Sequence, residues 1–216
     1  MKIKWLGHSC FLITSASGVK IIADPYKCGG MGLKYDKLGD SAHVVTASHG
    51  HGDHGAVDEV DGDPVILNSV GKTQTSGIDI TGIDSYHDDT QGTQRGNNII
   101  FCFDVDGIRV CHLGDLGHTL SDSQLADMGK VDVLLLPVGG KFTIDPVVAT
   151  NVSDQVMPKV VIPMHVKNAK CEFVPYGIDD YTKGKTKVKQ MDDSEIELMA
   201  DDLIANTEIV ILNHAR

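Results

Sequence analysis

The sequence predicts an α/β fold in which two β-sheets pack face to face and helices cover them on the outside. Short apolar, β-branched segments recur along the whole chain, whereas only two convincing helices can be placed. Strands dominate the first part of the chain and alternate with helices in the later part, as in a layered sandwich. A chain of 216 residues can bury a core of its own, so residues 1–216 are predicted to form a single domain.

The strands are expected where short apolar runs are bounded by Gly, Asp, Asn or Pro. These runs are residues 2–6, 10–14, 19–23, 44–47, 65–68, 78–85, 99–105, 108–113, 133–138, 160–163, 195–198 and 208–212. Ser17-Gly18 and Asp106-Gly107 have the composition of tight hairpin turns. We therefore expect antiparallel hairpins around both dipeptides.

The helices are fewer because the chain is poor in helix-forming acidic residues: of its 30 acidic residues, 25 are Asp and five are Glu. One helix is expected to begin at Ser121 or Asp122 and to end at Met128, with Gly129 as its C-cap. A second follows Asp145-Pro146 and ends before Pro158. A weaker helical segment follows His54, and the polar, Lys-rich residues 176–193 are expected to form a long surface loop.

Charge and composition exclude several classes of function. The net charge of −11 and an aromatic content of 5% disfavour nucleic-acid binding, because a negative surface repels phosphates and few rings are present to stack on bases. No apolar segment approaches the roughly 20 residues that a membrane span requires. The first residues lack the features of a signal peptide, so we expect no membrane partner and a cytoplasmic location.

The five cysteines show no CxxC spacing. They are Cys10, Cys28, Cys102, Cys111 and Cys171. We expect most of them to be buried, small apolar residues in a reducing compartment, with no disulfide framework and no zinc ribbon.

The clearest chemical motif is the segment His49-Gly-His51-Gly-Asp53-His54, which follows an apolar strand. Its glycines permit tight turns, so that neighbouring side chains can converge. His49 and His51 can reach one ion, and Asp53 and His54 point to a second position nearby. A histidine-rich surface turn is the alternative, but burying three histidines and one aspartate without a cation is costly.

The H-x-H-x-D-H pattern resembles that of the metallo-β-lactamase superfamily, which it matches in full. The resemblance implies a four-layer αββα sandwich with a dinuclear metal site at one edge of the two sheets. It also implies three later ligands at strand ends, for which His87, Asp115 and His165 are the candidates.

The resemblance further implies how the ligands divide between two ions. The first ion would be held by His49, His51 and His87, the second by Asp53, His54 and His165, with Asp115 bridging both. Zinc suits this mixed set of histidine and carboxylate ligands best, and manganese, iron or nickel also fit.

A closer similarity lies in the segments around the ligands. WLGHSCF at residues 5–11, DP at 24–25, residues 86–95, HLGD at 112–115, LPVGG at 136–140 and PMH at 163–165 carry it. They resemble a branch of small metal-dependent hydrolases similar to ascorbate-6-phosphate lactonase. The resemblance extends to about residue 167, and residues 168–216 contain no motif that indicates a role.

Further candidates surround the predicted ligands. Asp24 is expected to accept the free ring N–H of a ligating histidine. His8 and His112 are candidate catalytic neighbours, His112 either orienting Asp115 or contacting a substrate oxygen, and Asp53 could accept a proton during attack. The candidates for substrate binding lie on loops near strand ends: Arg95, Lys141, Thr143 and His118.

The predicted reaction is hydrolysis of a small-molecule ester, lactone or phosphoester by a hydroxide held between two divalent ions. Two alternatives use the same fold. A diiron redox protein resembles a pattern with Glu at the second motif position, where this chain has His51. A metal-binding protein without catalysis is the other alternative. Homo-oligomers are common among similar proteins, so a homo-oligomer is also considered.

Overall fold

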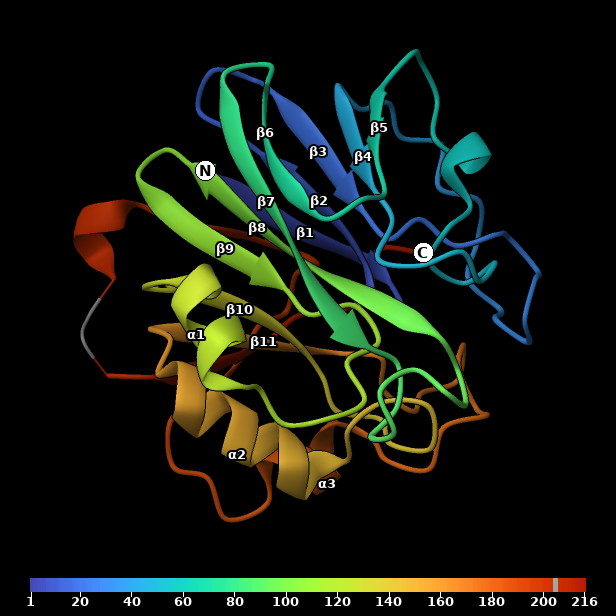
Figure 1. Ribbon diagram of the computed structural model, residues 1–216, viewed down its shortest axis with the longest axis vertical. Helices are drawn as coiled ribbons and strands as arrows, with labels where there is room; N and C mark the ends of the chain where they lie inside the picture. Colours follow the sequence, from blue (N-terminus) through green and yellow to red (C-terminus); the bar gives the residue numbers. More distant parts are fainter. Residues whose placement is uncertain (204–205) are drawn as a thin grey trace.

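The computed structural model describes residues 1–203 and 206–216, which form two β-sheets packed face to face (Figure 1). The first sheet comprises β1 (Lys2–Gly7), β2 (Cys10–Thr14), β3 (Lys20–Ala23), β4 (Val44–Thr46), β5 (Val65–Leu67) and β13 (Glu195–Glu197). The second comprises β6 (Gly71–Thr75), β7 (Ile78–Tyr86), β8 (Asn97–Val105), β9 (Ile108–His112), β10 (Val133–Pro137), β11 (Val160–Met164), β12 (Val188–Gln190) and β14 (Glu208–Ile211).

Both sheets are mixed. The order of the first is β13-β1-β2-β3-β4-β5, and that of the second is β12-β14-β11-β10-β9-β8-β7-β6. The hairpins β2–β3 and β8–β9 are antiparallel, as their turn sequences predict, whereas β3–β4 and β10–β11 run parallel. In the turn between β8 and β9, Asp106 and Gly107 both have positive φ angles, of 52° and 76°, which a type I′ hairpin turn requires.

The main core lies between the two sheets. Alternation of side chains along β1 places Ile3 and Trp5 in this core and Leu6 on the opposite side of the sheet. Strand β10 is buried along its whole length, because the first sheet covers one of its faces and helices cover the other. The predicted α/β sandwich is therefore confirmed.

The helices α1 (Asp122–Met128), α2 (Pro146–Val156) and α3 (Ile178–Thr182) lie beside the second sheet (Figure 1). Ser121 caps α1 by accepting a hydrogen bond from the backbone N–H of Gln124. Asp145 caps α2 and Pro146 occupies its first turn. Both predicted helices are confirmed, whereas the expected helix after His54 is reduced to the 3-10 turn η1 (Val57–Glu59).

The outer face of the first sheet has a cover of a different kind. Tyr26, Leu33, Tyr35 and Leu38, all buried, lie in the loop between β3 and β4 and belong to a second apolar cluster with Leu12. In the described part of the chain this cover consists of loop segments and η1, without an α-helix. The outer layer on this side thus differs in composition from the helical layer over the second sheet.

Residues 176–193 do not form the predicted surface loop. They contain α3 and β12, and β12 pairs in parallel with β14. The prediction was wrong because β12 is a short, exposed strand at the edge of its sheet, where no apolar pattern marks it. Strand β6, exposed at the opposite edge, was missed for the same reason.

The cysteines also differ from expectation. Cys102 and Cys111 lie directly opposite each other in β8 and β9 and form a disulfide, so the prediction of no disulfide was wrong for this pair. The two-residue turn at Asp106-Gly107 sets the register that places the two cysteines opposite each other, whereas their spacing alone carries no such signal. Cys10 and Cys171 are free and buried, as expected, and Cys28 is free and exposed.

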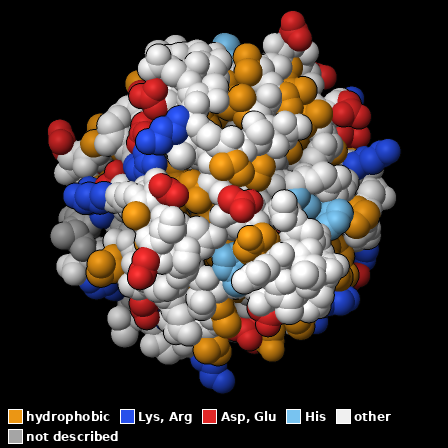
Figure 2. Space-filling model, viewed as in Figure 1, with side chains coloured by type: hydrophobic (Ala, Val, Ile, Leu, Met, Phe, Trp, Pro, Cys, Tyr) orange, Lys and Arg blue, Asp and Glu red, His pale blue; other side chains and the backbone are white. Residues whose placement is uncertain are grey.

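The surface carries its negative charge in dispersed form. Acidic side chains are spread over the face that Figure 2 shows, and hydrophobic ones gather near the end that carries β5 and β6. The exposed apolar residues there include Val65, Ile66 and Val70. Among the described residues, no helix has the length and apolar character needed to cross a membrane.

Candidate metal centre

The predicted ligands meet at one edge of the sandwich, where loops leave the carboxyl ends of several strands. The H-x-H-x-D-H segment follows β4, and His87, Asp115 and His165 follow β7, β9 and β11. Strands β9, β10 and β11 run parallel to one another, so loops that leave their carboxyl ends emerge at the same edge. The fold thereby collects ligands that are more than a hundred positions apart in the sequence.

The structure brings all seven predicted ligands together, and His8 with them. Three groups of side chains each have ligand atoms within 4.8 Å of one another. They are His49, His51 and His87; His49, His54 and Asp115; and His8, Asp53, His54 and His165. The first and third groups match the division between two ions that the resemblance implies, with His8 added to the third.

Asp115 lies between the two groups of histidines. Its Oδ2 is 3.2 Å from His87 Nε2 and 4.0 Å from His49 Nε2. Its Oδ1 is 3.0 Å from His54 Nε2 and 3.5 Å from His165 Nε2. Each carboxylate oxygen therefore faces a different group, which is the arrangement that a bridging ligand needs.

The chemistry of these atoms fits divalent metal ions. Among the described residues, the Nε2 atoms of His49 and His165 and Oδ1 of Asp53 are buried without a hydrogen-bond partner. Such unpaired buried polar atoms are costly unless a cation satisfies them. Burial lowers the pKa of both His49 and His165 to about 3, so their rings are neutral at pH 7, as metal ligands must be.

Unlike those of His49 and His165, the pKa values of His54 and Asp115 are shifted toward the charged forms. Burial opposes a charge on either residue, yet Asp115 and Asp24 raise the pKa of His54 well above its ordinary value. The histidines around Asp115 lower the pKa of its carboxyl group well below the usual range. Without metal, His54 therefore holds a proton between two carboxylates, and a divalent ion would replace that proton.

Asp24 fixes the motif segment by hydrogen bonds to Ser48 and His54. Its Oδ2 accepts hydrogen bonds from His54 Nδ1 at 2.7 Å and from the Ser48 hydroxyl at 2.6 Å. Its Oδ1 accepts from the Ser48 backbone N–H at 2.8 Å. Asp24 is fully buried and directs Nε2 of His54 toward the site, which is the contact predicted for it.

His112 lies behind the ligands, fully buried, and does not line the cavity at the site. Its Nε2–H donates to the Ser9 carbonyl at 2.7 Å, and its Nδ1 accepts from the Gly114 N–H at 3.1 Å. Both ring nitrogens of His112 are thus engaged within the protein, and neither is free for the predicted contact with a substrate oxygen. The bond to Gly114 fixes the backbone next to Asp115 instead.

A cavity of about 430 Å³ opens onto the metal centre. It is lined by Met31, His51, Asp53, His87, Gln94, Arg95, Asp115, Phe142 and Phe173. This volume lies within the range of small-molecule sites. The cavity therefore combines ligand side chains at its base with aromatic rings and one guanidinium group on its walls.

Arg95 reaches the cavity because Asp88 shapes the loop that carries it. Oδ1 of the buried Asp88 accepts hydrogen bonds from the backbone N–H groups of Thr90 and Gly92, and Oδ2 accepts from those of Gln94 and Arg95. The Arg95 guanidinium lies 5.6 Å from the centre of the Phe142 ring. Asp88 was not singled out by the sequence, although its place directly after a ligand was a usable signal.

The other residues predicted to bind substrate do not line the cavity. Lys141 is exposed and donates to the Phe173 carbonyl, and the Thr143 hydroxyl donates to the Ile144 carbonyl. His118 accepts from the Tyr86 N–H and donates to the Thr119 carbonyl. These side chains contact backbone groups here, and their role in substrate binding stays a prediction.

Several residues at the site had no sequence signal. Phe173 lies in the segment after residue 167, and it reaches the cavity because the chain returns across the site after β11. Cys171 lies in the same segment, and its Sγ is 3.8 Å from His8 Nδ1. Single aromatic or cysteine residues outside a motif give no indication of such a position.

Comparison with known proteins agrees with this site. Residues 2–165 match the family described as the beta-lactamase superfamily domain. UPF0173 metal-dependent hydrolases of Archaeoglobus fulgidus and Methanoculleus marisnigri are 30% and 31% identical to this chain; each match covers 76% of this chain, and 83% and 80% of those proteins. A Thermotoga maritima structure, described as a candidate Zn-dependent hydrolase of the metallo-beta-lactamase superfamily, superposes with a TM-score of 0.81 at 34% identity, and the match covers 98% of this chain and 97% of that one. The chain belongs to the metallo-β-lactamase superfamily.

Proposed function

We propose that this protein is a dinuclear metal-dependent hydrolase of a small ester, lactone or phosphoester. The observation that carries the proposal is the position of Asp115, whose two carboxylate oxygens face two separate groups of histidines at the base of a cavity. The names of the relatives support metal-dependent hydrolysis. The number of ions and the class of substrate are our inference from the site.

The residues would divide between two ions. His49, His51 and His87 would hold the first, Asp53, His54 and His165 the second, and Asp115 would contact both. Two such ions would lower the pKa of a bound water and polarise the oxygen of a carbonyl or phosphoryl group. Zinc is the proposed metal, and manganese, iron or nickel are compatible with the same ligands.

The remaining residues would bind and orient. Arg95 would attract an anionic part of the substrate, while Phe142 and Phe173 would pack against its apolar part and keep bulk water away. Asp53 would accept a proton during attack. Burial alone would raise its pKa, but His8 and His54 lower it, so the carboxylate is ionised at neutral pH, as a proton acceptor must be.

The proposed partner is a small molecule that reaches the site from the cytoplasm. The cavity of about 430 Å³ accommodates a small substrate. The net charge of −11 opposes binding of nucleic acid. We propose no membrane partner, and a homo-oligomer is compatible with the site.

The test is metal analysis combined with a screen of phosphodiester, lactone and thioester reporters. We expect two transition-metal ions per chain and turnover that a chelator abolishes. His51→Ala and Asp115→Asn should each lose metal and reduce turnover at least about 100-fold, because each removes a ligand. Asp63→Asn, an exposed carboxylate away from the ligands, is the matched control and should change neither.

The outcomes separate the hydrolase from the alternatives. A protein that binds two ions but turns over no reporter would favour the non-catalytic metal protein. Redox cycling of bound iron would favour the diiron alternative. Turnover that survives in a metal-free His51→Ala/Asp115→Asn double variant would refute the proposal.

A further inference from the structure

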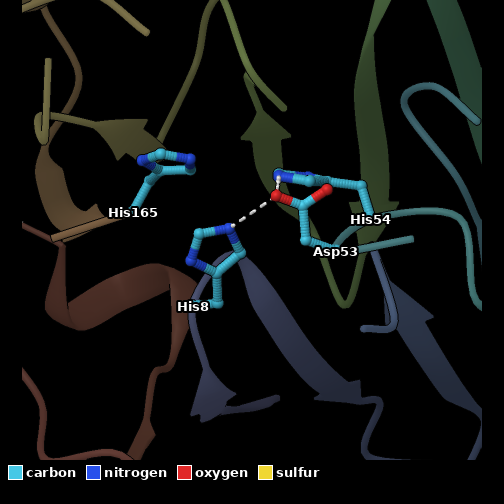
Figure 3. Close-up of side chains that lie close together, drawn as sticks. All are labelled: His8, Asp53, His54 and His165. Carbon is cyan, nitrogen blue, oxygen red and sulfur yellow. Dashed lines mark ion pairs between the residues drawn. The ribbon is translucent and has the colours of Figure 1, made fainter. Parts of the chain in front are cut away.

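His8 occupies a position in the third ligand group that the superfamily resemblance does not assign to it. It lies in the turn between β1 and β2, and it is fully buried. Figure 3 shows His8, Asp53, His54 and His165 directed toward a common point. All four side chains are buried, and their ligand atoms lie within 4.8 Å of one another.

The distances around His8 Nε2 suit a ligand better than a hydrogen bond. Nε2 lies 3.5 Å from Asp53 Oδ2, beyond the usual 2.7–3.2 Å of an N–H···O bond. Two neighbouring ligand atoms on one zinc ion are separated by about 3.0–3.6 Å, given metal–ligand distances of about 2.1 Å and angles of about 90–120° between them. Among the described residues, His8 Nε2 has no hydrogen-bond partner although it is buried.

The backbone of His8 is fixed in a conformation that is uncommon for residues other than glycine. Its φ angle is 52°, in the left-handed region. Its carbonyl accepts hydrogen bonds from Trp5 Nε1 at 2.9 Å and from the His165 N–H at 3.2 Å. The second bond ties the β1–β2 turn to the residue that carries another ligand, and the two imidazole rings lie 4.3 Å apart.

The other ring nitrogen of His8 has a partner that leaves Nε2 free. Nδ1 lies 3.8 Å from Sγ of the buried Cys171, close enough for an N–H···S hydrogen bond. A ligating histidine needs such a partner at its second nitrogen, which fixes the ring and keeps the lone pair of Nε2 for the ion.

We infer that His8 is a fifth protein ligand of the second ion, in addition to Asp53, His54, His165 and the bridging Asp115. This inference rests on the proposed function. It makes the two metal positions unequal. The second has four buried side chains of its own besides Asp115, whereas the first has three, of which His51 is exposed and lines the cavity.

The unequal ligand sets predict an order of filling. The second position should take up the first equivalent of metal and hold it more tightly. The first position keeps room for a water molecule or a substrate atom, as catalytic metal sites do.

The test is titration of the metal-free chain with Co²⁺, whose visible absorption reports the number and type of ligands. We compare the wild type with His8→Ala, His8→Gln and His43→Ala. His43 is an exposed histidine outside the ligand groups and serves as the matched control. Thermal unfolding of the metal-free variants shows whether each is folded, and His8→Gln is retained as the milder change.

We expect the wild type and His43→Ala to bind two ions with distinct affinities. Both His8 variants should bind the first equivalent at least about 100-fold more weakly, above the loss typical of residues that only orient a ligand. In both variants the absorption bands of this first Co²⁺ ion should shift. Added imidazole should restore the bands in His8→Ala by filling the vacated position.

Two results would overturn the inference while leaving the proposed function intact. Unchanged affinity and bands in both variants would exclude ligation by His8. A defect in His8→Ala that His8→Gln repairs would show that His8 acts by donating a hydrogen bond to Asp53, since a glutamine amide can also donate. A wild-type chain that takes up no metal would overturn the inference and the proposed function together.

Discussion

Replacement of Asp24 by asparagine should weaken metal binding without reshaping the site. Asn has nearly the same size, and it tolerates the left-handed backbone that residue 24 adopts with a φ angle of 50°. The change removes the negative charge that faces His54 Nδ1 at 2.7 Å, and it replaces one acceptor oxygen by an NH₂ group. Either His54 or Ser48 then loses its partner.

The size of the effect follows from these contacts. Loss of a carboxylate that orients a metal-bound histidine typically costs 10–100-fold in affinity, or about 1.4–2.7 kcal/mol. In the metal-free protein, Asp24 also faces the protonated His54, whose other ring nitrogen still faces Asp115, so losing one of these two charged contacts should cost about 1.5–3 kcal/mol of folding free energy. Asp24→Ala should cost about 1–2 kcal/mol more, because alanine is strained in the left-handed region.

The assay is chelator competition for zinc, combined with urea unfolding of the metal-free and metal-loaded proteins. Asp63→Asn serves as the control for loss of one exposed negative charge. The reasoning would be refuted if Asp24→Asn bound zinc as tightly as the wild type. Equal stability of Asp24→Asn and Asp24→Ala would refute the argument that alanine is strained in the left-handed backbone of residue 24.

Three further predictions concern the loops and the core. Asp88→Ala should speed hydrogen exchange of the loop amides up to Arg95 at least about 10-fold, because four of these N–H groups lose their acceptor; exchange as slow as in the wild type would contradict this role. Gly139→Ala should lower both stability and metal affinity, since the new Cβ would lie 1.9 Å from the His165 carbonyl oxygen. Urea unfolding measures the stability, and metal titration measures the affinity. Burial raises the pKa of Tyr35 to about 12. The neutral phenol therefore contributes fully to the free energy of unfolding below pH 10, and from pH 10 to 12 this contribution falls by up to about 1.4 kcal/mol per pH unit. Urea unfolding of the wild type and Tyr35→Phe across this range tests it, and parallel pH profiles would disprove it.

The sequence was most informative where the site is encoded locally. Four ligands lie within six residues, and the resemblance to the superfamily, together with their positions after apolar strands, predicted that His87, Asp115 and His165 join them. Asp24 was predictable because it follows a strand at the same edge of the sheet.

The rest depends on distances that a pattern does not contain. Lys141 and Thr143 follow a strand end but donate hydrogen bonds to backbone carbonyls, whereas Phe173 lies outside every motif and lines the cavity. The edge strands β6 and β12 are exposed along nearly their whole length and therefore lack the apolar signal of buried strands.

The origin of the ligands in both sheets has a consequence for how the protein unfolds. His54 belongs to a loop of the first sheet, whereas Asp115 and His165 belong to loops of the second. An ion bound by all three would be a removable cross-link between two layers otherwise joined mainly by apolar packing. The layers could not separate until that cross-link opened, so the lifetime of the folded chain should follow the rate of metal release and the free metal concentration around it.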